Sequence, residues 1–302
     1  MEKLLLIDGN AILHRAYHAL PPLTNTKGEV VNAVYGFFSM LLSVGIELRP
    51  EYLIVCFDRP KPTFRQQMFA GYQQHRPALA DDFAPQIVLM HEILAAVKVA
   101  VFELDGYEAD DVIGTIAVQA IDLEVIILSA DRDLLQLVNA RVKVLSPVVG
   151  VKNTVLYDSE KVKEKFGIVP SQVVDYKALV GDASDGYPGV TGIGPKTASS
   201  LLARYKTFEN LYAHIGELPE KVGLKLATDA EQAALAKKLA TIVVDAPVTV
   251  DFEKCRVQQW LLRDWVRAFE EQGFKSLVAR AKNFFWFEKK TEKKEEQLGL
   301  LD

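Results

Sequence analysis

Three acidic side chains lie within four consecutive positions of the sequence Gly-Tyr-Glu-Ala-Asp-Asp at residues 106–111. They are Glu108, Asp110 and Asp111. An apolar run with helical spacing follows, so these acids belong to the first turn of a helix whose other face is buried. Carboxylates this close repel one another by several kcal/mol per pair at an effective dielectric of about 20. A divalent cation that prefers hard oxygen ligands, Mg²⁺ or Mn²⁺, would hold them together.

Further acids follow the ends of other predicted strands. Near-continuous apolar runs predict five buried strands, at residues 4–7, 52–57, 99–102, 124–128 and 142–145. The first strand ends at Asp8, the second ends at Asp58, and the fourth leads to Asp131 and Asp133. Apolar strands that alternate with helices, such as those predicted at 11–20 and 30–48, indicate an α/β fold with a mainly parallel sheet flanked by helices.

Ligands of open α/β sheets bind outside the carboxyl ends of the strands. Any one of these acids could instead be a turn former or a helix cap, or could complement the helix dipole. Because all of them converge on one edge of one sheet, the set as a whole predicts a metal site there.

Residues 59–84 follow Asp58 directly and show little periodicity. They mix basic, amide and aromatic side chains, among them Lys61, Phe64, Arg65, Phe69, Tyr72, His75 and Arg76. Long loops inside a compact domain are usually functional, and this composition suits a single-stranded nucleic acid through phosphate contacts and base stacking. A solvated loop or a short helical lid is the alternative.

Two more acids, Asp182 and Asp185, precede a glycine-rich turn at residues 188–194 that opens a predicted helix at 197–205. Exposed backbone N–H groups at such a turn can hold phosphate, and a helix N-terminus favours anions. The glycine spacing of this turn differs from the Walker pattern, and no predicted strand precedes the turn. A plain helix–turn–helix connection would explain the same residues.

The composition of the chain is that of an ordinary globular protein. It has 302 residues, of which 49% are hydrophobic and 25% charged, and a formal net charge of −5. That charge argues weakly against nucleic-acid binding, but a carboxylate-rich metal site makes a chain acidic. Cys56 and Cys255 lack metal-ligand spacing, which fits a reducing cytoplasm. The first apolar run is too short for a signal sequence or a membrane span.

The C-terminal third reads as mixed helix at 210–240, extended chain at 243–252, an amphipathic helix at 260–269 and a shorter one at 274–280. Residues 288–296 form a charge run typical of a disordered linker.

Together these residues resemble the 5′ nuclease family, in particular the 5′→3′ exonuclease domain of bacterial DNA polymerase I, which is related to flap endonucleases. The resemblance runs from about Leu4 to about Phe285. Its most specific pieces are GYEADD from Gly106, SADRDLLQL from Ser129, GDASD from Gly181 and PGVTGIGPKTA from Pro188. It implies a PIN-like nuclease core at 1–180 with a helical arch at about 59–92. A helix–hairpin–helix DNA-binding region would follow at 181–287, and a charged flexible tail at 288–302.

The resemblance also implies a metal-dependent enzyme that hydrolyses phosphodiesters. One Mg²⁺ or Mn²⁺ would be held by Asp8, Asp58, Glu108, Asp110 and Asp111, and a second by Asp131, Asp133, Asp182 and Asp185. Two such ions activate a water and stabilise the leaving oxygen. The implied substrates are DNA with 5′ flaps, nicks or RNA primers, cleaved during Okazaki fragment maturation and repair.

Further site residues are carried over from the family. Arg65, Tyr72 and Arg76 would act near the scissile phosphate. The implied DNA contacts are Arg15, Lys61, Gln73, Gly189, Gly192, Gly194, Lys196 and Thr197. Backbone carbonyls around Val190 and Ile193 would hold a potassium ion.

The chain departs from the family pattern at two positions. The arch usually carries Tyr-Lys, and here it reads Tyr72-Gln73, which removes a charge near the scissile phosphate. Gly186 replaces the asparagine that usually follows Asp185. A second hypothesis is therefore a catalytically weak module that binds flaps or junctions. A PIN-type ribonuclease is a third, disfavoured because such enzymes are usually shorter and lack the helix–hairpin–helix.

The last residues are similar to the short C-terminal motif by which bacterial replication proteins bind the sliding clamp. The matching residues are Gln297, Leu298, Leu300 and Leu301. We also expect a monomer in the cytoplasm, associated with the nucleoid. The chain is either a stand-alone nuclease or the N-terminal part of a DNA polymerase I.

Overall fold

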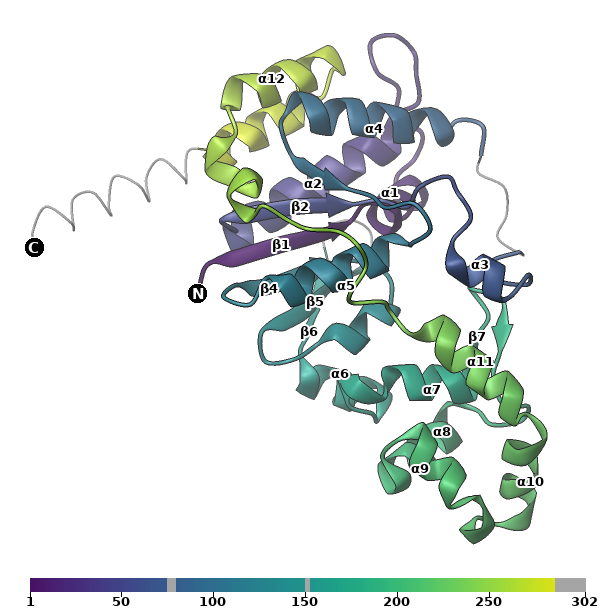
Figure 1. Ribbon diagram of the computed structural model, residues 1–302. Helices are drawn as coiled ribbons and strands as arrows, with labels where there is room; N and C mark the ends of the chain where they lie inside the picture. Colours follow the sequence, from purple (N-terminus) through teal and green to yellow (C-terminus); the bar gives the residue numbers. More distant parts are fainter. Residues whose placement is uncertain (75–79, 150–152, 286–302) are drawn as a thin grey trace, which may run out of the picture.

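The computed structural model describes residues 1–74, 80–149 and 153–285, and it contains a central six-stranded sheet flanked by helices (Figure 1). The strand order is β3-β2-β1-β4-β5-β6. In chain order the strands are β1 (Lys3–Asp8), β2 (Tyr52–Cys56), β3 (Ala100–Phe102), β4 (Glu124–Leu128), β5 (Val142–Val149) and β6 (Asn153–Tyr157). The first five run parallel and β6 is antiparallel to β5. The predicted mainly parallel α/β fold is confirmed, while β6 was not predicted.

Each central strand contributes to two hydrophobic cores, one on either face of the sheet. Leu4 and Leu6 of β1 lie in one core and Leu5 and Ile7 in the other, as successive side chains of a strand point to opposite faces. Leu6 pairs with residues of both neighbouring strands, Ile54 and Ile127. Burial on both faces explains why these strands read as continuous apolar runs in the sequence.

Helices cover both faces of the sheet. The helices of the N-terminal half are α1 (Gly9–Ala19), α2 (Asn32–Leu48), α3 (Phe64–Met68), α4 (Ala84–Ala96), α5 (Ala109–Gln119) and α6 (Ser159–Phe166). Apolar residues of α5 belong to the core that contains Leu4, and those of α1, α2 and α4 to the core that contains Leu5. Asp8 begins α1 as its N-cap, with its side chain accepting a hydrogen bond from the Ala11 N–H at 3.0 Å.

The predicted arch at 59–92 contains α3 and the first part of α4. Between them, residues 70–74 form turns, and residues 75–79 lie outside the described part of the chain. His75 and the predicted phosphate contact Arg76 are among the latter.

Residues 170–240 form a separate cluster of helices at the bottom of Figure 1. It contains α7 (Val173–Val180), a small hairpin of β7 (Gly181–Asp182) and β8 (Tyr187–Pro188), α8 (Pro195–Tyr205), α9 (Phe208–Ala213), α10 (Glu220–Thr228) and α11 (Ala230–Ala240). The mixed helix predicted at 210–240 is therefore three helices. Pro219 interrupts the run because it has no backbone N–H to donate, and α10 begins after it.

Two glycines, Gly181 of the hairpin and Gly189 directly after it, bring their backbones into close contact. A Cβ built on Gly181 would lie 2.3 Å from the backbone nitrogen of Gly189, and the reverse contact is equally short. Gly181 also has a φ of +76°, which favours glycine. A side chain at either position would force the hairpin that carries Asp182 and Asp185 apart from the glycine-rich turn.

The C-terminal helices return to the N-terminal half. Trp265 and Phe269 of α12 (Leu262–Glu271) meet Phe38 of α2 edge to face, with ring centroids 6.0 and 5.2 Å apart. Residues 275–285 are also helical, and Arg280 donates to Ser39 of α2 at 2.6 Å. The sequence analysis places these residues in the 181–287 helical region. In the structure they pack against α2 of the sheet region, because α2 presents a large apolar face to them.

The possible clamp motif at 297–301 and the charged tail lie outside the described residues. None of the helices that the structure describes is long and apolar enough to cross a membrane.

Candidate metal centre and active site

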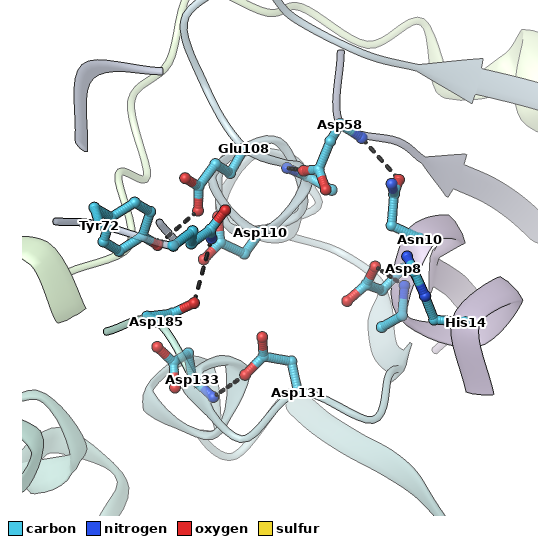
Figure 2. Close-up of a pocket in the computed structure, with 13 residues that line it drawn as sticks. Asp8, Asn10, His14, Asp58, Tyr72, Glu108, Asp110, Asp131, Asp133 and Asp185 are labelled. Atoms are coloured by element: carbon cyan, nitrogen blue, oxygen red, sulfur yellow. Dashed lines mark hydrogen bonds between the residues drawn. The ribbon is translucent and has the colours of Figure 1, made fainter. Parts of the chain in front are cut away.

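An acidic cavity of about 180 Å³ opens at the carboxyl ends of β1, β2 and β4 (Figure 2). Seven carboxylates line it, those of Asp8, Asp58, Glu108, Asp110, Asp131, Asp133 and Asp185. The other lining residues are Asn10, Ala11, His14, Tyr72, Gln73 and Ala109. The structure thus brings together acids from five segments of the chain that are far apart in the sequence.

Asp8 and Asp58 are fixed by hydrogen bonds on one side of the cavity. Asp8 accepts from the Ser129 hydroxyl at 2.7 Å, in addition to the Ala11 N–H. Asp58 accepts from the N–H of Ala109 at 2.7 Å, at the start of α5. Burial raises the pKa of Asp8 to about 7, although both hydrogen bonds to its carboxylate oppose that shift.

Glu108 and Asp110 face the cavity from the first turn of α5. The Glu108 carboxylate accepts from the hydroxyls of Thr63 and Tyr72, each at 3.0 Å. Burial raises the pKa of both Glu108 and Asp110. Asp110 Oδ1 is buried and has no hydrogen-bond partner among the residues that the structure describes. An unsatisfied carboxylate oxygen among other hard oxygens fits a divalent cation such as Mg²⁺ or Mn²⁺.

A second group of acids adjoins the first. Ligand oxygens of Asp133, Asp182 and Asp185 lie within 4.8 Å of one another and could hold a metal ion. The Lys177 ammonium contacts the carboxylates of Asp133 and Asp182. Burial alone would raise the pKa of Asp182, but the ion pair with Lys177 and the hydrogen bonds from Ser184 together outweigh burial, and the net pKa is lowered. Lys177 therefore supplies the positive charge of this group in the metal-free protein.

Asp111 does not reach the cavity, in contrast to its predicted role as a metal ligand. Its side chain is 0% exposed and its two oxygens accept from the Arg65 guanidinium at 2.7 and 2.8 Å. Asp110 and Asp111 are adjacent on α5 and are therefore about 100° apart around its axis, so only one can face the cavity.

Arg65 is likewise 1% exposed, in contrast to its predicted contact with the scissile phosphate. Besides Asp111 it donates to the backbone carbonyls of Leu239 and Thr241, each at 2.9 Å. One of its nitrogens also lies 3.5 Å from Glu108. Burial and four hydrogen bonds make Arg65 a fixed positive charge next to the cavity.

Tyr72 and Gln73, for which the family resemblance implies substrate contacts, both line the cavity. Gln73 has a φ of +56°; its N–H donates to the Asp185 carbonyl at 2.7 Å, and its side-chain amide donates to the Asp185 carboxylate at 3.3 Å. Two other predicted DNA contacts have partners within the protein. Lys61 pairs with Asp105 at 2.6 Å, and Arg15 donates to the Val148 carbonyl at 2.6 Å.

The glycine-rich turn lies apart from the cavity, since none of its residues lines it. Gly194 is the N-cap of α8, with exposed Lys196 and half-buried Thr197 in the first turn. Gly189 packs against Gly181. In the predicted potassium loop, the Val190 carbonyl accepts from the Ile193 N–H at 3.0 Å, and the Gly192 carbonyl accepts from the Lys225 ammonium at 2.9 Å.

Sequence reasoning missed the residues that support the acids. Lys177, Thr63 and Ser129 are single polar residues in ordinary surroundings, and their partners are remote in the chain. For Lys177 a signal did exist, because it lies only five residues before Asp182 in the sequence.

Comparison with known families and proteins divides the chain between the sheet region and the helical cluster. Residues 3–167 match the family described as "5'-3' exonuclease, N-terminal resolvase-like domain", and residues 168–262 match "5'-3' exonuclease, C-terminal SAM fold". A 5'-3' exonuclease of Aquifex aeolicus is 36% identical over 287 residues, which cover 94% of this chain and 97% of that protein.

A DNA polymerase I of Bacillus caldotenax is 42% identical over 282 residues, which cover 92% of this chain. The match spans about a third, 32%, of that polymerase. Among solved structures, T5 5'-exonuclease with bound zinc has a TM-score of 0.67 at 20% identity and covers 94% of this chain and 98% of its own. That likeness shows a shared fold.

Breaking the Arg65–Asp111 pair is expected to destabilise the protein. Arg65→Met or Asp111→Leu should each lower the free energy of unfolding by about 3–5 kcal/mol, since each leaves a buried charge without its partner. The double variant Arg65→Met/Asp111→Leu should lose less than the sum of the two. Urea denaturation measures the free energy of unfolding of each variant. Lys161→Met, which breaks the exposed Lys161–Glu164 ion pair, is the control and should not change stability. Strictly additive losses would contradict the buried pairing.

Asp8 is expected to make the metal-free protein less stable as pH rises. Its pKa is about 7 in the folded protein against 3.8 in an unfolded chain, so between these values the folded state binds more protons. Stability from this group is therefore present below pH 4 and is lost as pH rises to about 7. In EDTA, Asp8→Asn should show a weaker decline than wild type from pH 5 to 8 by urea denaturation. The exposed Asp122→Asn should follow wild type; equal slopes for all three would refute the assignment.

Proposed function

The chain belongs to the 5'-3' exonuclease family, and we propose that it is a metal-dependent 5′ nuclease that cleaves DNA at 5′ ends and 5′ flaps. The observation that carries this proposal is the cavity lined by seven carboxylates, with the buried and unsatisfied Asp110 oxygen inside it. Such a donor set suits ions that act on phosphodiesters.

Two divalent cations at this site would activate a water for attack and stabilise the leaving oxygen. We assign one to Asp8, Asp58, Glu108 and Asp110, and the other to Asp131, Asp133, Asp182 and Asp185. Asp111 is left out because both of its oxygens bind Arg65.

The chain's own residues hold these ligands in place. Tyr72 and Thr63 fix both oxygens of Glu108, and Ser129 fixes one oxygen of Asp8. Oriented ligands need little reorganisation when a cation and a phosphate enter, which favours the transition state. Tyr72 also lies within the predicted arch and lines the cavity, so substrate in the cavity would lie beside it.

Duplex DNA would be held by the turn at residues 188–197. The N-terminus of α8 offers backbone N–H groups to a phosphate, and Lys196 is exposed beside them. We also propose a potassium ion at the carbonyls of this turn. Because the Lys225 ammonium already donates to the Gly192 carbonyl, potassium would have to displace it.

The biological context is part of the proposal. It comprises removal of RNA primers, Okazaki fragment maturation and repair, by a monomer that works at the nucleoid and contacts the sliding clamp through residues 297–301.

Cleavage of a 5′-labelled flap duplex tests the function. Wild-type protein should cut near the flap junction in Mg²⁺ and not in EDTA. Asp110→Ala should lower the single-turnover rate by about 1,000-fold or more, because several kcal/mol of charge stabilisation depend on the metal. Asp245→Ala, which removes an exposed acid, should cut normally. Metal-independent cleavage, or full activity of Asp110→Ala, would refute the proposal.

The alternative of a junction-binding module rests on Gln73, whose uncharged amide lies against Asp185 in the cavity. Gln73→Lys adds a positive charge there and should raise the single-turnover rate about 10-fold, since charge develops on the phosphate in the transition state. Gln74→Lys adds the same charge at the exposed neighbouring position and should have little effect. Wild type that binds flaps without cutting, and cuts after Gln73→Lys, would favour the alternative. A flat or lower rate would show that Gln73 does not limit catalysis.

A further inference from the structure

The ammonium of Lys177 lies against the second acidic group, which consists of Asp133, Asp182 and Asp185. Ligand oxygens of these three acids lie within 4.8 Å of one another. The ammonium contacts one oxygen of Asp133 and one of Asp182, and the side chain of Lys177 is only 13% exposed. A cation that belongs to the chain itself is therefore already bound to two of the three carboxylates.

The local structure fixes this arrangement. Lys177 lies in the last turn of α7, Asp182 in β7 directly after that helix, and Asp133 begins the short helical turn Asp133–Leu137. One oxygen of Asp182 accepts from Lys177, and the other accepts from the Ser184 N–H at 2.7 Å. A metal ion that binds Asp182 thus meets a donor at either oxygen.

The first acidic group has its positive charge in a different place. The Arg65 guanidinium makes its short contacts with Asp111, at 2.7 and 2.8 Å, and it lies 3.5 Å from Glu108 and 3.9 Å from Asp110. Arg65 therefore does not have to leave its partners when a cation enters the cavity. Asp110 Oδ1, moreover, has no hydrogen-bond partner among the residues that the structure describes.

We propose that Lys177 competes with the divalent cation of the second acidic group, so that the first group fills at a lower metal concentration than the second. This inference rests on the proposed function, because it assumes that both groups take a metal. An ammonium and a divalent cation on the same carboxylates repel each other strongly at a separation of a few ångströms. The ammonium must therefore leave Asp133 and Asp182, and the apparent metal affinity falls with the fraction of molecules in which it has left.

A lysine that only orients the two carboxylates would behave in the opposite way. Hydrogen bonds to ligating carboxylates hold them in position, and loss of such a bond weakens metal binding. Removal of a competitor strengthens metal binding instead. The sign of the change in affinity therefore distinguishes the two roles.

Calorimetric titration of the full chain with Mn²⁺ measures this sign. Wild type should bind two Mn²⁺ ions in separate steps. Lys177→Met removes the charge and keeps the length of the side chain, so it should bind the weaker ion about 10-fold more tightly and the tighter ion as before. Its melting temperature in EDTA should be lower than that of wild type, because two acids lose their counter-charge, and Mn²⁺ should raise it by more.

Lys143→Met is the matched control. It breaks another lysine–carboxylate pair, with Glu124 at 2.7 Å, near the amino ends of β4 and β5 and thus at the opposite edge of the sheet from the cavity. It should bind both Mn²⁺ ions as wild type does. Lys177→Gln, which also removes the charge, provides the same test if Lys177→Met does not fold.

Weaker or unchanged binding of the second Mn²⁺ by the Lys177 variants would overturn the inference while leaving the proposed function in place. If neither wild type nor any variant binds Mn²⁺, the proposed function fails as well.

Discussion

Repulsion among carboxylates at one edge of the sheet is the constraint on which the rest of the structure depends. Seven acids line one cavity, and in the metal-free protein their charges must be offset by the chain itself. Two devices do this. Buried Arg65 stands behind the first turn of α5, and Lys177 lies between Asp133 and Asp182. Burial also raises the pKa of Asp8, Glu108 and Asp110, because it disfavours the charged form of each carboxyl group.

The Arg65–Asp111 pair also joins parts of the chain that are far apart. Arg65 lies on α3 at the base of the arch, Asp111 on α5, and their remaining hydrogen bonds reach the backbone at Leu239, Thr241 and Val243. The helices α3 and α5 and the segment that leaves the helical cluster thus meet at this buried pair. Thr115 of α5 adds hydrogen bonds to the backbone of the same segment at Val243 and Ala246. The Arg65–Asp111 pair therefore contributes both to the position of the first turn of α5 and to the attachment of the helical cluster.

The sequence allowed the sheet and the acidic edge to be predicted, because buried parallel strands read as apolar runs and their ends carry acids. It could not show which of Asp110 and Asp111 faces the cavity, since that depends on Arg65, which lies 46 positions away from Asp111 along the chain. For the same reason the contact of Lys177 with Asp133 was missed, since these two residues lie 44 positions apart along the chain. The antiparallel strand β6 was missed, and the break at Pro219 was not used to divide the helical run.

The C-terminal helices pack against α2, so the end of the described chain contacts its N-terminal half. Residue 256 pairs with Tyr52 beside β2, Val257 donates to the Glu51 carbonyl at 2.9 Å, and Arg256 forms an ion pair with Glu2. The two matched families meet at residues 167–168. Because of these contacts, we do not expect the two fragments on either side of that boundary to fold independently. A fragment that ended there would leave the ring of Phe38 without its contacts to Trp265 and Phe269, whereas two fragments produced together could restore these contacts by association.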